Sequence, residues 1–411
     1  MNLPSSVGGD RGTRPAVFLL MGALFTSALA YSAVLPVLPL ILQRSGLTPG
    51  AVTWHTGMLT GVYMLTVFLF APLWGRVSDR IGRRPLIVLG LAGMAVALIG
   101  FALFRTLPLA YVSRALTGIF VAAVIPVATA EVGDISDLSS RAHRFALLTS
   151  ASLLGFLAGP ALGGWLTNAS WLGSGASVGA GGYAPVVAAA VLSALTAVAV
   201  MLLLPRGRPV SADGETRDAV APNGPAIDRA APALLVLLVM FALASFEVGI
   251  TLRGQQRLGW SPAQIGLVFA ECSVVMVIIQ GFLFSMLIKR VPGGWLLGPG
   301  LAAMIAGLAL IPVTADYDRI LLLVMLISAG ASVVAPMITY WASMGAGLAQ
   351  GAALGTQTAA SSLGQALGSA AVATLFGILP AAPFWLAAAL LAGGAALLVA
   401  RGGAPLRTAS A

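Results

Sequence analysis

The chain has 411 residues, of which 59% are hydrophobic and only 9% are charged, and its mean hydropathy is +0.98. Soluble chains are about 25% charged, so this composition excludes a soluble enzyme, a nucleic-acid-binding protein and a disordered protein. The formal net charge of +9 comes from basic residues in short segments between apolar runs, which is typical of a membrane protein.

Twelve apolar runs are long enough to cross a bilayer, which takes about 20 residues as a helix. The runs lack the alternation of membrane barrel strands, so helices are the spanning option. We predict an all-α membrane protein with twelve transmembrane helices in two six-helix bundles. The predicted spans are 15–42, 52–74, 85–104, 107–130, 145–168, 183–204, 232–252, 262–288, 295–313, 320–341, 350–379 and 383–400.

The first apolar run has an alternative interpretation as a signal peptide. Arg11 and Arg14 precede it, and the A-L-A string at 28–30 resembles a cleavage site. The run continues through Pro36 to Leu42, which is too long for the apolar region of a signal peptide. We therefore expect a retained first helix.

The distribution of basic residues predicts the orientation. With the N-terminus inside, 16 of the 22 Lys and Arg residues fall in inside segments and 5 in outside loops. This asymmetry favours cytoplasmic termini and a multi-pass protein of the plasma (bacterial inner) membrane. The expected order is a tail (1–13), a first bundle (14–204), a polar cytoplasmic linker (205–231), a second bundle (232–401) and a tail (402–411).

The strongest motif is expected in the short cytoplasmic turn between the second and third spans. It reads Gly75-Arg76-Val77-Ser78-Asp79-Arg80-Ile81-Gly82-Arg83-Arg84-Pro85. A basic inside loop would explain the arginines, but neither Asp79 nor the order of the residues. The pattern resembles the signature of the major facilitator superfamily, whose members are membrane transporters.

In that superfamily the loop acts as a conformational latch between the two halves. The resemblance implies that Gly75 permits close helix approach and that Asp79 faces the cytoplasmic end of span 350–379, where a helix N-terminus favours an anion. Arg80 and Arg83 could pair with Glu131 or Asp134. The expected latch residues are Gly75, Asp79, Arg80, Gly82, Arg83, Arg84 and Glu131.

Arg114 lies within span 107–130. A charge there costs roughly 2.5–3.5 kcal/mol, so it needs a partner or water. In the superfamily an arginine at this place is linked to proton transfer. The alternative is a structural pair with a polar group on a neighbouring helix.

Span 145–168 contains the string G-x-x-x-G-P-x-x-G-G, made by Gly155, Gly159, Pro160, Gly163 and Gly164. Small residues at this spacing favour close helix packing. The full string is similar to the antiporter motif of drug:proton exporters in the superfamily. We expect the glycine face to let this helix slide and rock against the other half.

Of the 13 acidic residues, only Glu247 and Glu271 lie well inside spans. A rise of 1.5 Å per residue places Glu247 about 22 Å from the inner end of its span and Glu271 about 14 Å below the outer end. Desolvation favours the neutral carboxyl, and a carboxyl that changes ionisation between states suits proton coupling. The alternatives are a buried hydrogen-bonding acid, or a pair of Glu247 with Arg253.

The first span departs from the exporter pattern. Drug exporters of this kind often have an aspartate nine residues before the first proline of a P-V-L-P stretch. Here that stretch is Pro36 to Pro39, and the matching position is Ser27. This weakens a close match to the tetracycline exporters and puts cationic drugs in doubt as the main substrate. Candidate substrate-binding residues within spans are Tyr31, Tyr63, Gln280, Tyr340, Trp341, Gln357 and Gln365.

These features predict a secondary transporter that exports a small organic molecule by proton antiport, with Glu247, Glu271 and Arg114 as proton-coupling residues. The sequence has no phosphate-binding G-x-x-x-x-G-K-[ST] loop, so we expect an ion gradient to drive transport. The alternatives are a proton-coupled importer of a metabolite or siderophore, and a polytopic membrane enzyme. We expect no cofactor, no metal and no nucleic-acid partner, and a monomer in the lipid bilayer.

Overall fold

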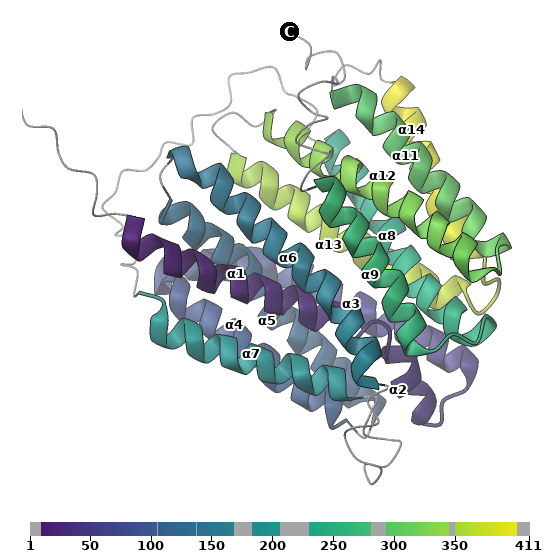
Figure 1. The fold of residues 1–411 in the computed structure, drawn as a ribbon, viewed down its shortest axis with the longest axis horizontal. Helices are drawn as coiled ribbons and strands as arrows, with labels where there is room; N and C mark the ends of the chain where they lie inside the picture. Colours follow the sequence, from purple (N-terminus) through teal and green to yellow (C-terminus); the bar gives the residue numbers. More distant parts are fainter. Residues whose placement is uncertain are drawn as a thin grey trace, which may run out of the picture.

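The computed structural model describes residues 10–104, 106–136, 138–167, 183–205, 230–280, 293–344 and 350–400. These residues form twelve helices of 17 or more residues, one short helix (α2), one 3-10 turn (η3) and no strand (Figure 1). The elements are α1 (Asp10–Ser32), α2 (Leu38–Arg44), α3 (Pro49–Ile81), α4 (Arg83–Ala102), α5 (Leu107–Asp134), α6 (Leu138–Thr167), α7 (Ala184–Leu203), α8 (Ala230–Arg257), α9 (Pro262–Ile278), α11 (Gly293–Leu310), η3 (Ile311–Val313), α12 (Tyr317–Met344), α13 (Gln350–Leu375) and α14 (Ala382–Ala400).

Eight of the described helices are long and apolar enough to cross a membrane. Three shorter apolar stretches occur at Leu147–Pro160, Pro262–Ile278 and Ala382–Leu398. Many apolar side chains on these helices face outward, as expected for contact with lipid; Val96 is 73% exposed and Leu202 is 69% exposed. The prediction of an all-α, multi-pass membrane protein is confirmed.

The helices form two groups, α1–α7 and α8–α14, which lie on opposite sides of the molecule in Figure 1. Packing in the second group repeats packing in the first. α1 contacts α5, α6 and α7, as α8 contacts α12, α13 and α14; α4 lies against α5 and α7, as α11 lies against α12 and α14. Between the groups, α3 packs on α13 and α6 packs on α9. This is the repeated architecture that the span count alone suggested.

The first predicted span, 15–42, is not one helix. α1 ends at Ser32, a turn follows, and α2 begins at Leu38. Pro36 lacks the N–H that a continuing helix needs, so the helix is interrupted here. The break places the last turn of α1, with Tyr31, in the middle of the molecule.

The turn between the second and third spans is also shorter than predicted. α3 continues to Ile81, so Gly75 to Arg80 are helical, and α4 begins at Arg83. Gly82 alone makes the reversal, with φ of 98°, a backbone angle that glycine adopts without strain. The motif is therefore the last turns of α3 and the first turn of α4 rather than a loop.

The expectation that the glycine stripe of α6 faces the other half is wrong. A Cβ atom on Gly155 would overlap the carbonyl oxygen of Phe25, and one on Gly163 would lie 2.9 Å from the carbonyl oxygen of Ala33. Phe25 and Ala33 belong to α1 and the turn after it, in the same group. The stripe fixes α6 to α1, and α13 repeats this with Gly364 and Gly368 against α8.

The two groups meet closely at the end of the molecule where α2 lies, which we call the α2 end (Figure 1). Near the start of α3, a Cβ atom on Gly57 would lie 2.6 Å from Cβ of Ala373, and one on Gly61 would lie 3.2 Å from the carbonyl oxygen of Ala366. Both partners are on α13. Backbones in such close contact leave no passage between α3 and α13 at this end.

Substituting Gly159 by alanine should destabilise the protein. The new Cβ would overlap Oγ of Ser32 and lie 2.7 Å from the backbone nitrogen of Ala33, which cannot move independently of α1. We expect a loss of about 1–3 kcal/mol, typical of overpacking, and a lower thermal midpoint of the purified protein. Gly22→Ala is the matched control, since no atom lies within 4 Å of a Cβ there. Equal midpoints for the two variants would contradict this account of the stripe.

Candidate functional site

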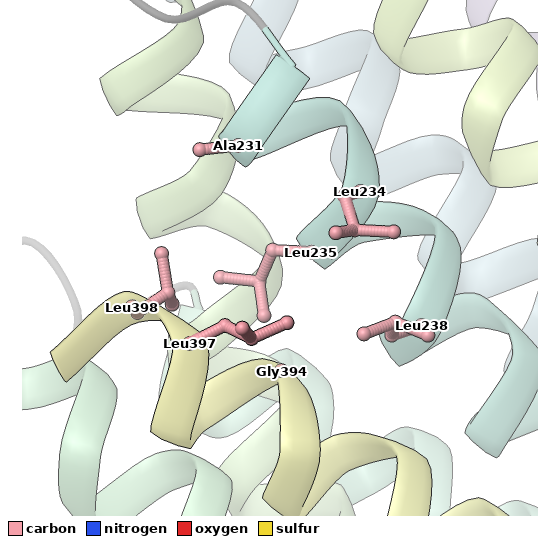
Figure 2. Close-up of a pocket in the computed structure, with 7 residues that line it drawn as sticks. All are labelled: Ala231, Leu234, Leu235, Leu238, Gly394, Leu397 and Leu398. Carbon is pink, nitrogen blue, oxygen red and sulfur yellow. The ribbon is translucent and has the colours of Figure 1, made fainter. Parts of the chain in front are cut away.

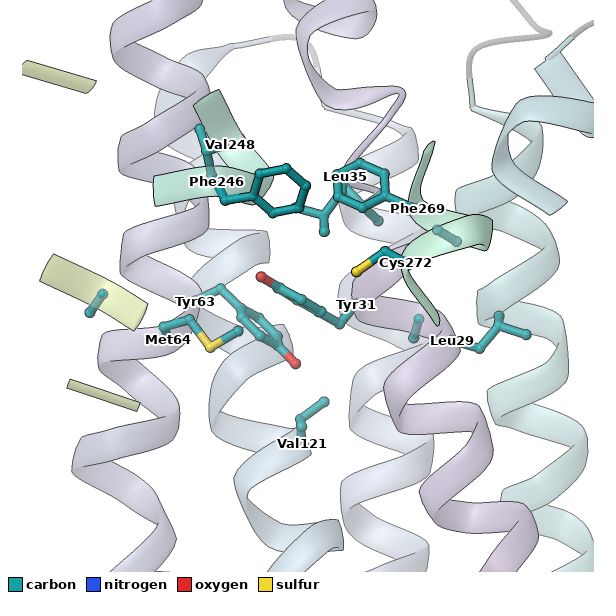
Figure 3. Close-up of a cluster of buried hydrophobic side chains, with 14 of the residues drawn as sticks. Leu29, Tyr31, Leu35, Tyr63, Met64, Val121, Phe246, Val248, Phe269 and Cys272 are labelled. Atoms are coloured by element: carbon teal, nitrogen blue, oxygen red, sulfur yellow. The ribbon is translucent and has the colours of Figure 1, made fainter. Parts of the chain in front are cut away.

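Four polar residues from four helices meet in the middle of the bundle. The rings of Tyr31 on α1 and Tyr63 on α3 are stacked, with centroids 5.2 Å apart (Figure 3). The guanidinium carbon of Arg114 on α5 lies 4.8 Å from the centroid of the Tyr63 ring. On the other side, the hydroxyl of Tyr31 donates a hydrogen bond of 3.0 Å to Oε2 of Glu247 on α8. All four residues were candidates from the sequence.

Local packing explains how the rings come together. Tyr31 is in the last turn of α1, which α6 approaches across the glycine stripe, and Phe156 of α6 lies 6.1 Å from its ring. Gly118, one turn after Arg114, allows α5 to lie against the backbone of α3. A Cβ atom at Gly118 would overlap the carbonyl oxygen of Tyr63. The missing side chain therefore lets Arg114 reach the face of the Tyr63 ring.

Arg114 is fully buried, with an exposed fraction of 0%. Among the described residues, none of its three guanidinium nitrogens has a hydrogen-bond partner. Its contacts are the ring of Tyr63 and, at 5.9 Å, the ring of Phe101. A desolvated cation over an aromatic face gains about 2 kcal/mol, less than the cost of burying it. The alternative of a polar partner on a neighbouring helix is not found in the described part of the chain.

Glu247 is half-buried, and its carboxylate reaches across to the first group of helices. The alternative pair with Arg253 is not formed. Arg253 instead donates hydrogen bonds to the carbonyl oxygens of Ile311 and Thr314, the latter at 2.8 Å, and so holds the end of α11. Glu247 thus points to the interior and is bonded to Tyr31.

Glu271 lies on α9, and its Oε2 atom is buried without a hydrogen-bond partner among the described residues. It is not brought to Tyr31. The next residue, Cys272, is the single cysteine of the chain; it is buried and belongs to the same cluster of buried side chains as Tyr31 (Figure 3).

The other described substrate candidates lie on α13 or just after α9. Gln365 on α13 donates a 3.5 Å hydrogen bond to Ser361 on its own helix. Gln357 is half-buried on α13, and Gln280 is half-buried just after α9. The side chains of Tyr340 and Trp341 lie outside the described set.

The latch residues lie at the end of the molecule opposite to α2. Arg83 donates a hydrogen bond to Oγ of Ser78, and Arg84 donates one to the carbonyl oxygen of Met201 on α7. Arg80 is exposed, Glu131 is buried, and no atom of the described residues lies within 4 Å of a Cβ built on Gly75. The close approach expected at Gly75 is absent from this conformation. The side chain of Asp79 lies outside the described set.

Hydrogen bonds also join the two groups at the α2 end. Nε2 of Gln255 on α8 donates to the carbonyl oxygen of Pro36 at 2.9 Å. Oγ1 of Thr53 on α3 donates to Oε1 of Gln256 at 3.2 Å. Thr53, Gln255 and Gln256 were not among the candidates from the sequence. Two adjacent glutamines at the end of an apolar run were the signal that could have identified them. Together with Tyr31 and Glu247, they close the α2 end.

A separate crevice lies between α8 and α14 (Figure 2). Its lining is alanine, glycine and leucine, from Ala231 to Leu238 on one side and from Gly394 to Leu398 on the other. It offers no polar side chain that could orient a ligand, so it does not compete with the central site as the place of recognition.

Comparison with known proteins shows the same architecture. The model of the Major Facilitator Superfamily matches residues 20–369. Multidrug resistance protein 1 of Bacillus subtilis is 28% identical over 93% of this chain and 95% of its own length. Quinolone resistance protein NorA of Staphylococcus aureus is 24% identical over 90% and 92%. The class C tetracycline resistance protein of Escherichia coli is 30% identical over 72% and 73%.

Solved structures show the same fold. A bacterial homologue of the human lysosomal transporter Spinster, in an inward-facing and unoccupied conformation, has a TM-score of 0.73 at 16% identity, covering 98% of each chain. The human organic anion transporter MFSD10 has a TM-score of 0.68 at 23% identity, covering 94% of this chain and 99% of that chain.

Closure of the α2 end can be tested by cross-linking. With Cys272 replaced by serine, Thr53→Cys and Gln256→Cys should be joined rapidly by a short bis-maleimide in the purified, substrate-free protein, because their native side chains are in contact. Mass spectrometry of the linked peptides measures the yield. Each single-cysteine variant is the control, and a pair that stays unlinked would show that the two groups are apart at this end.

Proposed function

Because the chain belongs to the major facilitator superfamily, we propose that it exports a small organic molecule in exchange for protons, by alternating access. The chain is a membrane transporter and not an enzyme. Its similarity to multidrug, quinolone and tetracycline resistance proteins supports export and a foreign or metabolic organic compound as cargo. Proton antiport and the direction of transport are the parts that this proposal adds.

The observation that carries the proposal is the hydrogen bond from Tyr31 to Glu247. It places an ionisable carboxyl on the boundary between the two groups of helices, at the end that is closed. An acid there senses the conformational change directly, because its hydrogen-bond partner leaves when the groups separate. A carboxyl on a lipid-facing or permanently paired surface would have no such coupling.

The sign of the coupling follows from solvation. When the α2 end closes, Glu247 leaves water, and burying a neutral carboxyl costs less than burying a carboxylate. Protonation should therefore precede closure. Once closed, the Tyr31 hydroxyl can stabilise the carboxylate after the proton has left toward the opposite end. Return to the open state then requires cargo to compensate for the broken hydrogen bond.

The positive-inside asymmetry supports cytoplasmic termini, which puts the α2 end on the outside. In this orientation the closed α2 end would belong to an inward-facing form. The moving units would be the predicted bundles 14–204 and 232–401. Of the linker 205–231, residues 206–229 lie outside the described ranges, as do residues 1–9 and 402–411 of the two tails.

The predicted latch residues would join the two groups of helices in the outward-facing conformation. In the outward-facing form the ends of α3 and α13 opposite α2 would approach, with Gly75 allowing contact and Asp79 meeting the first turn of α13. A helix N-terminus attracts a carboxylate there. Glu131, Arg80, Arg83 and Arg84 would complete this contact. Glu271 would serve as a second proton site, and the transporter would work as a monomer in the bacterial inner membrane.

The central test is proton movement in proteoliposomes with an acidic interior. Adding a quinolone such as norfloxacin outside should dissipate the pH gradient, since antiport moves a proton outward for each molecule that enters. Glu247→Gln should lower the rate at which the added compound dissipates the pH gradient at least tenfold. Its thermal midpoint should stay close to that of the unmodified protein. A pH-sensitive dye inside the vesicles measures the response.

The same assay separates antiport from import. A proton-coupled importer would carry protons inward with the added compound and acidify the interior further. An unchanged response in Glu247→Gln would remove Glu247 from the mechanism. Asp318→Asn, which removes an exposed acid in the first turn of α12, is the control for loss of an acid outside the central site.

A further inference from the structure

The charge of Arg114 has no counterpart beside it within its own group of helices. The acids that the sequence places in α1, α3 and α5 are Asp10, Asp79, Glu131 and Asp134; Asp10 is the first residue of α1, and the others lie near the ends of α3 and α5 opposite α2. Glu131 follows Arg114 by 17 residues on the same helix, about 25 Å along its axis. A buried cation without a compensating anion is costly, so an anion from elsewhere is expected in part of the transport cycle.

Glu247 does not supply that anion in this conformation. The stacked rings of Tyr31 and Tyr63 stand between it and Arg114, and its Oε2 atom accepts the hydrogen bond from Tyr31. The first helix contributes no acid near Arg114 either, since its one acid, Asp10, is its first residue. Ser27 stands at the position where many exporters have an aspartate, and its hydroxyl is hydrogen-bonded to the carbonyl oxygen of Ala23 at 2.8 Å.

The donor geometry of Arg114 indicates which anion fits. A guanidinium presents two parallel N–H groups that match the two oxygens of a carboxylate. All three nitrogens are without hydrogen-bond partners in the described part of the chain, so the full donor set is available. The surrounding surface is aromatic: Tyr63 and Phe101 contact the guanidinium, and Tyr31 and Phe156 follow.

We propose that the cargo is an aromatic carboxylate and that Arg114 binds its carboxylate group. With the α2 end closed, the ring of Tyr63 covers the guanidinium of Arg114. When Tyr63 rotates away, the carboxylate of the cargo takes the place of this ring. The planar part of the cargo then stacks on Tyr31. This inference rests on the proposed transport function and names the chemical class of the substrate.

A matched pair of fluorescent dyes tests the proposal. Rhodamine 110 has a free carboxylate, and rhodamine 123 is its methyl ester, so they differ in the group that Arg114 would recognise. Fluorescence polarisation with the purified protein should show the acid binding at least about tenfold more tightly than the ester, the effect of one charge-assisted pair. Arg114→Gln should reduce this preference to within about twofold.

Two variants control the comparison. Arg114→Lys keeps the charge but loses the planar pair of donors, so it should retain part of the preference. Arg319→Gln, which removes an exposed arginine at the start of α12, should keep the full preference, because it leaves the guanidinium of Arg114 unchanged. Equal affinity of the two dyes for the unmodified protein, or a preference that survives in Arg114→Gln, would overturn the proposal.

An inorganic anion is the other source of negative charge. The test replaces methanesulfonate by 200 mM chloride and measures the thermal midpoint. If chloride raises the midpoint of the unmodified protein but not that of Arg114→Gln, and if the two dyes bind equally, then Arg114 binds chloride and the carboxylate proposal is wrong.

Failure of this proposal is distinct from failure of proton antiport. If the two dyes bind the unmodified protein equally and rhodamine 123 still dissipates the pH gradient, antiport stands and the carboxylate site falls. If the unmodified protein prefers the acid dye but neither dye moves protons, the carboxylate site stands and antiport falls.

Discussion

A buried cation, Arg114, and a half-buried carboxyl, Glu247, lie on opposite sides of two stacked tyrosines, and this arrangement decides what the protein can do. Neither charge is stable in a low-dielectric interior without a partner. Glu247 has a phenol from the opposite group of helices, whereas Arg114 has only aromatic faces. The two residues therefore differ. Glu247 gains a hydrogen-bond partner when the α2 end closes, whereas the guanidinium of Arg114 has no hydrogen-bond partner among the described residues and could bind an anion.

The repeated packing explains where motion can occur. In each group a glycine-bearing helix, α6 or α13, lies in backbone contact with the first helix of the group, α1 or α8. Such contacts leave no room for sliding. The boundary between the groups also contains close backbone contact, where Gly57 and Gly61 of α3 face α13. Hydrogen bonds from Thr53 to Gln256 and from Gln255 to the carbonyl oxygen of Pro36 cross it at the α2 end. The glycine contacts therefore stiffen each group, and in the proposed alternating access the contacts at the boundary are the ones that would separate.

The similarity to resistance proteins is compatible with the absence of an aspartate at position 27 of the first helix. The class C tetracycline resistance protein is 30% identical over most of this chain, although Ser27 occupies the position that the sequence pattern assigns to an aspartate. In this protein the intramembrane acids lie in α8 and α9 of the second group, while the intramembrane cation lies in α5 of the first. Opposite charges on opposite groups give each conformation its own electrostatic balance.

The sequence by itself determined the fold class, because hydrophobic length and charge distribution are properties of the chain that need no tertiary contact. It also singled out Arg114, Glu247, Tyr31 and Tyr63, since a polar group inside an apolar run stands out at once. Only the tertiary structure decided that these four residues meet, because they come from four helices whose rotation depends on packing. It also decided that the glycine stripe faces α1, that Pro36 ends the first helix before the bundle boundary, and that Gln255 and Gln256 close one end. A helical period shows that a face exists, but the neighbouring helix determines what that face contacts.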